Sequence, residues 1–402
     1  MDTFDKLLTL GSAARFDVCA AGCGGASKRK PTSPLGDIGV RAIFHARVSG
    51  GKSVPLLKIL QTNACRHNCL YCANRAERGH RRIRFQPDEL ASLFMDLQSR
   101  GHVQGLFLSS GVEGSPARTM AEMLTTAEIL RHRYGFAGYI HLKVLPGAPY
   151  DCVERAVELA NRVSVNMEAP TEGQLTRIAP DKHMPGDVIQ RMHWIRQAAS
   201  RRDGAMSAGQ STQFIVGAGR ETDRELLTAA TALYRDVNLR RAYFSAFEPI
   251  ADTPLEEQPP APPMREHRLY QTDWLLRCYV GAYSLGEIVF NDAGNLPLEV
   301  DPKLAIALRQ PERFPIEVNR ADFIELLRVP GIGPKSARSI VRERKTGRIS
   351  DLQELRRKGV VARRAAPFLL INGCAQGSVE TLTREHLCQL SDDRQLSLPF
   401  SG

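Results

Sequence analysis

Residues 62–72 decide the fold and read Thr62-Asn63-Ala64-Cys65-Arg66-His67-Asn68-Cys69-Leu70-Tyr71-Cys72, directly after an apolar, strand-like run. Their cysteines have the spacing C-x3-C-x2-C. A [4Fe–4S] cluster takes a thiolate on each iron, so a set of three leaves one iron open to a ligand that is not protein. The alternative is a zinc site, which requires four closed ligands, usually in two separated pairs. We therefore expect Cys65, Cys69 and Cys72 to hold an open iron–sulfur cluster.

The composition predicts a globular protein without membrane segments. The chain has 402 residues and a hydrophobic content of 43%, enough for two or three domains with cores. It has no apolar run long enough to cross a bilayer, and Met1–Lys6 lacks the order of a signal peptide. Nine cysteines, an odd number, suit a reducing compartment. We expect a soluble, cytoplasmic protein; for the pair Cys19 and Cys23, a loop and an auxiliary metal site are both open.

The positive charge is concentrated near the C-terminus. The net charge is +10, and residues 334–364 contain eleven Lys and Arg against three acids, an excess of +8. A concentrated field of this kind attracts polyanions such as nucleic acid.

Residues 54–249 alternate short apolar runs with longer amphipathic ones, which is typical of strand–helix units in a parallel sheet. Strands are expected at Leu56–Gln61, Gly105–Leu108, Gly138–Val144, Arg162–Met167, Thr212–Val216 and Ala242–Phe247. Expected helices include Pro87–Arg100, Ala117–Tyr134, Asp223–Asp236 and, beyond a proline-rich connector, Arg265–Tyr283. The remaining C-terminal region predicts short helices.

Two of these strands have one polar and one apolar face. In the first of these strands, polar and apolar residues alternate, and the polar ones are Tyr139, His141 and Lys143. The second strand alternates in the same way, with the polar residues Ser164, Asn166 and Glu168. Helices cover the outer face of a parallel barrel, so the polar set is expected to point into the lumen. A polar lumen indicates a ligand site; an antiparallel sheet with one wet face is the alternative.

The cysteine triplet, with Tyr71 directly before Cys72, resembles the radical S-adenosylmethionine (SAM) superfamily. The resemblance implies an α/β fold, a partial (β/α)6 barrel, and an enzyme whose cofactors are a [4Fe–4S] cluster and SAM. An electron donor would reduce the cluster, and the 5′-deoxyadenosyl radical from SAM would abstract hydrogen from a substrate.

The same resemblance implies where SAM binds, because ligands in such folds gather at the carboxyl ends of the strands. Ser109, Ser110 and Gly111 occupy the place of the superfamily's Gly-Gly-Glu type motif, from which they depart. Asn166 and Glu168 are expected at the ribose and Gly217 at the adenine. His141 and Lys143 are expected to be catalytic groups near the substrate, although a structural role is open for each.

Residues 321–344 resemble the helix–hairpin–helix of DNA repair and recombination proteins, through Leu327-Arg328-Val329-Pro330-Gly331-Ile332-Gly333-Pro334-Lys335. Gly331 and Gly333 permit the turn, whose amides point at a phosphate. Lys335, Ser336 and Arg338 complete the expected DNA contact, which holds the backbone with little sequence preference. A helical turn used only for packing is the alternative.

The last residues resemble the peptide by which bacterial replication and repair proteins bind the sliding clamp. Gln395, Leu396, Leu398 and Phe400 match it. A glutamine followed by spaced apolar residues suits an extended peptide in a hydrophobic pocket. A plain amphiphilic tail is the alternative.

The whole chain resembles the bacterial family of DNA modification/repair radical SAM proteins, whose members are often encoded beside a uracil-DNA-glycosylase-like protein, here a candidate partner. The expected segments are an N-terminal extension (1–50), the radical SAM partial barrel (51–255), a proline-rich connector with helices (256–315), an all-α helix–hairpin–helix domain (316–375) and a flexible tail (376–402). Our first hypothesis is a radical SAM enzyme that modifies or repairs a base or lesion in DNA. The second is a DNA-binding adaptor with a structural or redox-sensing cluster, and the third a radical SAM enzyme acting on RNA or a protein partner.

Overall fold

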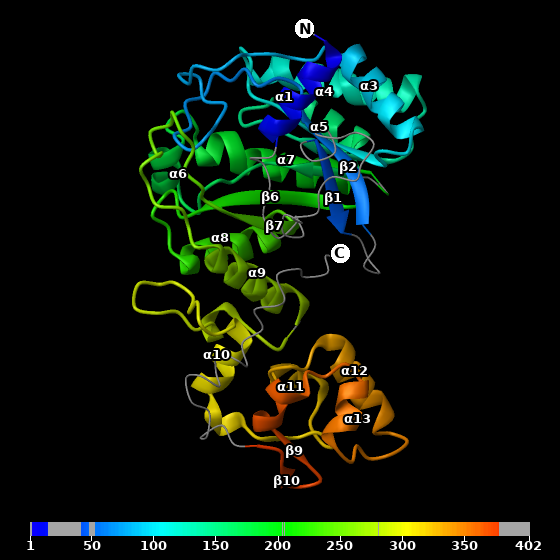
Figure 1. Cartoon of the computed structure of the whole chain (residues 1–402), viewed down its shortest axis with the longest axis vertical. Coiled ribbons are helices and arrows are strands. Elements are labelled where there is room, and N and C mark those ends of the chain that lie inside the picture. The colour runs from blue at the N-terminus through cyan, green and yellow to red at the C-terminus, as the bar shows by residue number, and fades with distance from the viewer. Residues whose placement is uncertain are drawn as a thin grey trace. The chain divides into compact units, whose positions relative to one another are not determined.

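The computed structural model describes residues 2–14, 42–47, 53–202, 204, 206–279 and 281–377. These residues form two compact units (Figure 1). Unit 1 contains the described residues up to Glu221 together with Thr228–Pro263. Unit 2 contains Thr222–Leu227 and the described residues from Met264 onward.

Unit 1 is built on a seven-stranded sheet with its strands in chain order. The strands are β1 (Ile43–Arg47), β2 (Ser53–Leu60), β3 (Gly105–Ser109), β4 (Tyr139–Lys143), β5 (Arg162–Ser164), β6 (Gly209–Val216) and β7 (Leu239–Ala246). Strands β2 to β7 are parallel, and β1 adds to the edge by antiparallel pairing with β2. Six consecutive parallel strands joined by helices give the half-barrel that the sequence predicts.

Helices follow most of these strands. Helix α1 (Thr3–Ala14) comes before the first strand. The helices after it are α3 (Pro87–Ser99), α4 (Pro116–Glu128), α5 (Tyr150–Leu159), α6 (Glu172–Ile178), α7 (Gln190–Ser200) and α8 (Asp223–Asp236). One π-helical segment, Ile129–Arg133, continues α4, and another, Met184–Ile189, precedes α7. Helices α3, α4, α5 and α7 pack side by side in chain order. On the side of the sheet that faces them, Gln210 of β6 donates from Nε2 to the carbonyl of Met192 in α7, at 3.3 Å.

Local sequence accounts for where the helices begin. Ser115 caps α4 by accepting the amide of Arg118 at 3.2 Å, and Pro116 occupies the first helical position, where a missing N–H has no cost. A capping box between Gln86 and Glu89 starts α3 in the same way.

The predicted elements of unit 1 are confirmed, with differences at their ends. The strand expected over Arg162–Met167 ends at Ser164, although the amides of Val165 and Met167 still donate to carbonyls of β6, at 3.2 and 3.1 Å. The strand expected from Thr212 begins at Gly209. The edge strand β1 was not predicted.

Unit 2 is mainly helical. Its helices are α9 (Pro263–Cys278), α10 (Pro302–Arg309), α11 (Phe323–Arg328), α12 (Pro334–Glu343), α13 (Leu352–Arg357) and α14 (Ala362–Ala365). Short 3-10 turns lie at Leu285–Glu287, Pro311–Arg313 and Ala366–Phe368. The helical C-terminal region is thus confirmed, and it also carries an unpredicted small sheet of β8 (Ile316–Glu317), β9 (Leu369–Ile371) and β10 (Cys374–Ala375).

Within the described ranges, no helix is both long enough and apolar enough to span a bilayer. The cytoplasmic location and the five segment boundaries stay predictions.

Candidate functional site

The cysteine loop follows β2 at its carboxyl end. Cys69 is buried, and Cys65 and Cys72 are partly exposed. The amide of Val112 donates to Sγ of Cys65 and the amide of Asn74 to Sγ of Cys72, both at 3.4 Å. Amides that point at a thiol sulfur stabilise its deprotonated form, which is the form that binds metal.

Arg82 and Asn63 hold this loop in shape. The Arg82 guanidinium donates to the main-chain carbonyls of Asn63, Asn74, Arg75, Ala76 and Arg78. The side chain of Asn63 closes the base by donating to the carbonyl of Arg81 at 2.9 Å and accepting the amide of Ile83 at 2.7 Å. One planar cation therefore binds five main-chain carbonyls of the loop, of which those of Arg75 and Arg78 also accept main-chain amides.

Burial favours the neutral form of the Cys69 and Cys72 thiols. Burial raises the pKa of Cys69, and it raises the pKa of Cys72 to about 12, with a further contribution from Cys69. Bound iron would supply the positive charge that makes thiolates stable in such surroundings.

The described residues contain no group of three or more His, Cys, Asp or Glu that could hold one metal ion. Thiolates that bind different irons of a cluster need not converge on one point, so this finding does not bear on a [4Fe–4S] cluster at the triplet. The three cysteines fit the cluster, and their role as its ligands stays a prediction.

The segment Ser109–Gly111 lies against the cysteine loop, as predicted from its position after β3. The amide of Gly111 donates to the carbonyl of Thr62 at 2.8 Å. A Cβ on Gly111 would lie 2.4 Å from the carbonyl oxygen of Ala64, so only glycine permits this approach. The hydroxyl of Ser110 is buried without a partner among the described residues, which suits a contact to a bound ligand.

Asn166 and Glu168 also reach the cysteine loop, through Lys182. Oε1 of Glu168 accepts from Asn166 Nδ2 and lies next to Lys182 Nζ, each at 3.3 Å, and the three side chains are buried. Burial alone would lower the pKa of Lys182, but Cys69 and Glu168 outweigh it and raise the pKa above its ordinary value. Oε2 of Glu168 has no partner among the described residues, so one carboxylate oxygen is left for a hydroxyl donor.

Lys182 is brought to the thiols by the segment that follows α6. The amide of Leu70 donates to the carbonyl of Ile178 at 2.8 Å, and the amide of Asn68 to Oδ2 of Asp181 at 2.7 Å. Sequence reasoning missed this lysine, since no local motif marks it.

Gly217, expected at the adenine, has a φ of +99°. Its amide donates to Glu221, and its carbonyl accepts from Gln258 Nε2 at 2.7 Å. Glu221 also accepts the amide of Gly219 at 2.9 Å. The main-chain groups of Gly217 are therefore engaged by protein, and the expected adenine contact stays a prediction.

His141 and Lys143 lie on the face of the sheet away from the helices, as predicted. His141 Nε2 is 2.8 Å from Ser164 Oγ, and the ring stacks on Phe107 with centroids 4.2 Å apart. These contacts fit a positioned lumen group; the catalytic role of both residues stays a prediction.

The hairpin in unit 2 has the expected shape. Gly331 has a φ of +85°, and a Cβ there would lie 2.6 Å from the carbonyl of Val361, so the turn requires glycine. Gly333 is the N-cap of α12 and supplies no side-chain cap, so the first amides of this ten-residue helix are left for another acceptor. Lys335 and Arg338 are exposed, whereas Ser336 is buried and could contribute only main-chain atoms.

Three of the eleven basic residues in 334–364 are not exposed, and each of these three makes contacts within the unit. Arg344 donates to the carbonyls of Val318 and Ala321, Lys358 pairs with Glu343 and Glu354, and Arg364 pairs with Asp301. The exposed ones are Lys335, Arg338, Arg342, Lys345, Arg348, Arg356, Arg357 and Arg363. The exposed basic residues thus still form a large set, but fewer of them are exposed than the eleven counted in the sequence.

Cys19, Cys23 and the clamp-binding-like residues Gln395, Leu396, Leu398 and Phe400 lie outside the described residues. Their expected roles stay predictions.

Residues 59–233 match the model of the radical SAM superfamily. The chain carries a radical SAM domain. The expected enzyme class and cofactors, a [4Fe–4S] cluster and SAM, are those of this domain. Residues 313–362 match the helix–hairpin–helix motif. Neither match names a substrate, and no curated protein matches the chain in sequence.

Solved structures similar to the chain include HydG, PylB and SuiB. HydG, a maturase of the [FeFe]-hydrogenase, has 14% identity and a TM-score of 0.42 over 54% of this chain and 48% of its own. Methylornithine synthase (PylB) has 16% identity and a TM-score of 0.42, covering 54% and 60%. Streptococcus suis SuiB, bound to S-adenosylmethionine, has 10% identity and a TM-score of 0.43, covering 54% and 47%. The chain spans about half the length of these proteins, and at such scores we transfer no role from them.

Proposed function

We propose that the protein is a radical SAM enzyme that modifies or repairs a base or lesion in DNA. The observation that carries the proposal is the presence, in one chain, of a radical SAM domain and a helix–hairpin–helix motif with an exposed basic surface. A hairpin of this kind is compatible with DNA binding, because its free amides and cations suit the phosphate backbone.

Each part of the site has a role in this proposal. Cys65, Cys69 and Cys72 would hold the cluster, which together with SAM supplies reductive cleavage of SAM. Ser110, Asn166 and Glu168 have buried polar atoms near the cysteine loop and would bind SAM. His141, positioned by Ser164 and Phe107, and Lys143 would face the substrate.

In unit 2 the hairpin would hold DNA. Gly331 and Gly333 shape the turn, the first amides of α12 would donate to a phosphate, and Lys335 and Arg338 add charge. Further proposed partners are an electron donor, the sliding clamp through the C-terminal residues, and a uracil-DNA-glycosylase-like protein.

The test is anaerobic SAM cleavage. The cluster is reconstituted, SAM and dithionite are added, and 5′-deoxyadenosine is quantified without nucleic acid and with duplex DNA, damaged duplex, single-stranded DNA and tRNA. We expect one form of DNA to stimulate the production of 5′-deoxyadenosine, and Cys65→Ala to abolish this production. The matched control is Cys374→Ala, which changes an exposed cysteine on β10 and should leave the production intact.

Two results would contradict the proposal. Absence of 5′-deoxyadenosine from protein with a full cluster would favour the adaptor. Stimulation by tRNA and not by any DNA would move the substrate to RNA.

A further inference from the structure

The parallel pairing of β2 to β5 aligns one row of side chains on the face away from the helices. Lys58 is paired with Phe107, Phe107 with His141, and His141 with Arg162. We call this the inward face and define it by its polar members Lys58, His141, Lys143, Arg162, Gln213 and Arg241. The contacts along the row are tight: Lys58 Nζ lies 5.1 Å from the ring centroid of Phe107, which stacks on His141.

The inward face is basic. Lys58, His141, Lys143, Arg162 and Arg241 come from four different strands, and the inward positions of β2 to β7 include no carboxylate. The acid that follows β5, Glu168, is next to Lys182. The side chains that the strands themselves contribute to the interior of the half-barrel therefore include basic groups and no acid.

Three donors on this face have no hydrogen-bond partner among the described residues. They are Nε of Arg162, Oγ of Ser211 and Nε2 of Gln213. Ser211 and Gln213 are buried, at 1% and 6% exposure, and the Nε atom of the partly exposed Arg162 is buried as well. One guanidinium nitrogen of Arg162 already donates to the hydroxyl of Tyr243 at 3.0 Å, and Tyr243 is paired with Gln213. Buried donors without partners indicate a ligand rich in acceptors.

This site borders the expected SAM site, because the carbonyl of Gln213 accepts the amides of Met167 and Glu168 at 3.1 and 2.9 Å, and it extends from there toward the amino ends of the strands. Arg162 is the first residue of β5, whereas the cysteine loop, Asn166 and Glu168 all follow the carboxyl ends of their strands. A ligand held by Arg162 would thus lie deeper in the half-barrel than SAM.

We propose that the inward face binds the phosphate group of a nucleotide through Arg162, with Ser211 and Gln213 as further donors. This inference rests on the proposed function and narrows it, since the unit recognised is a nucleotide with its phosphate and not the base alone. A phosphate offers acceptors only, and the planar guanidinium matches two of its oxygens.

The test is calorimetric binding of the four deoxynucleoside 5′-monophosphates, each compared with its deoxynucleoside, to the full-length reconstituted protein. We expect at least one monophosphate to bind about tenfold or more tightly than its nucleoside, and binding to weaken with salt. Arg162→Gln removes the charge and should remove this preference. Arg100→Gln, an exposed arginine on α3 that pairs with Asp96, is the matched control and should keep it.

Because Arg162→Gln could disturb the fold, Gln213→Glu is the second variant. It keeps the size of the side chain and adds a negative charge, so it should weaken the monophosphate and spare the nucleoside. Unchanged melting temperature and iron content of the variant would show that its fold is kept.

Equal affinity for monophosphates and nucleosides, or a preference that survives both variants, would overturn the inference. This readout is independent of SAM cleavage. If DNA stimulates SAM cleavage but no monophosphate binds more tightly than its nucleoside, the inference fails and the proposed function stands. If a monophosphate is preferred but no DNA stimulates SAM cleavage, the proposed function fails and the phosphate site stands.

Discussion

Lys182 brings a positive charge to the cysteine loop. Its ammonium group is buried, lies 3.3 Å from Glu168 Oε1 and has a pKa raised by Cys69 and Glu168 against the effect of burial. Charges and hydrogen bonds around cluster sulfurs set the reduction potential of iron–sulfur proteins. If the triplet holds the cluster, Lys182 stabilises its reduced and more negative state.

Lys182→Met should therefore shift the cluster potential to more negative values. A unit charge removed at contact distance corresponds to a few kcal/mol at an effective dielectric of about 20, which is on the order of 100 mV for one electron. Redox titration followed by electron paramagnetic resonance measures the shift. Lys182→Arg keeps the charge and should restore most of the potential; a Met variant with the wild-type potential would show that the charge has no such role.

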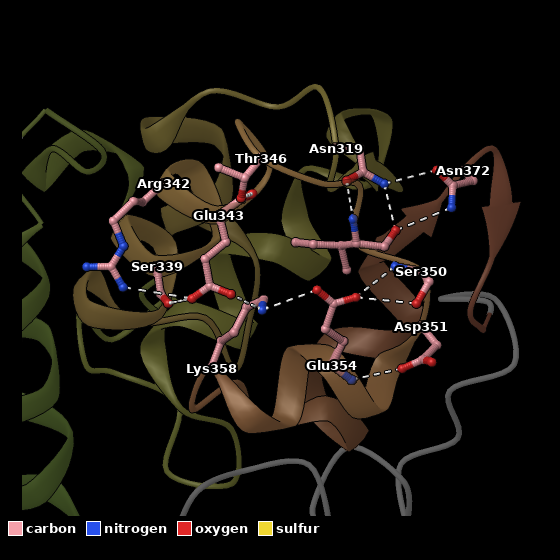
Figure 2. A network of polar contacts seen from close by, with 11 residues as sticks. Asn319, Ser339, Arg342, Glu343, Thr346, Ser350, Asp351, Glu354, Lys358 and Asn372 are labelled. Atoms are coloured by element: carbon pink, nitrogen blue, oxygen red, sulfur yellow. Dashed lines mark hydrogen bonds and ion pairs between the residues drawn. The ribbon is translucent and has the colours of Figure 1, made fainter.

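Helix α12 of the hairpin is joined to α13 by an ion-pair network (Figure 2). Lys358 contacts Glu343 of α12 and Glu354 of α13, and Glu343 also accepts the hydroxyl of Ser339 at 2.7 Å. Nearby, Asn319 fixes the preceding loop by donating to the carbonyl of Ile349 and accepting its amide, both at 2.9 Å. Charged side chains here hold the short helices that present the hairpin.

This network predicts loss of stability in acid. Hydrogen bonding from Lys358 lowers the pKa of Glu343, and hydrogen bonding from the amide of Ser350 lowers that of Glu354. A carboxylate with a lowered folded-state pKa stabilises fully above its unfolded pKa, about 4.3 for Glu, and loses this effect as the pH falls through the folded value.

Glu343→Gln should thus lower the melting temperature modestly at pH 7, and the difference from wild type should vanish below about pH 4. Thermal unfolding measured between pH 3 and pH 7 checks this. Glu312→Gln, which changes an exposed acid of the same unit, is the control and should show no such trend. A difference that persists unchanged in acid would mean that the ion pairs are not its cause.

At the scale of the whole molecule, the exposed cations of unit 2 predict DNA binding that depends on salt. Each phosphate contact adds about 0.9 to the slope of log affinity against log salt. Lys335→Gln and Arg338→Gln should each reduce the slope by about 1 and weaken all DNA sequences alike.

Fluorescence anisotropy of the full-length protein with two unrelated duplexes, at several salt concentrations, measures both effects. Arg100→Gln in unit 1 serves as the control and should keep the wild-type slope. Sequence-dependent losses in the Lys335 and Arg338 variants would contradict backbone recognition.

Much of the fold follows from local sequence. The strand–helix alternation predicted six parallel strands, because each unit buries its own apolar face. The hairpin glycines were also recognisable, since a positive φ restricts Gly331 to glycine at that position. The cysteine triplet pointed to the domain because its three cysteines are neighbours in the chain.

Tertiary structure decided what joins distant segments. It placed Asp181 and Lys182 on the cysteine loop, with Asn68 and Asp181 separated by 113 positions. It also assigned Arg82 to the loop carbonyls and Arg344, Lys358 and Arg364 to internal contacts, which no count of charges reveals. Spacing along the chain determines local geometry and ligand type, whereas the partner of a buried charge depends on which segments the packed core brings together.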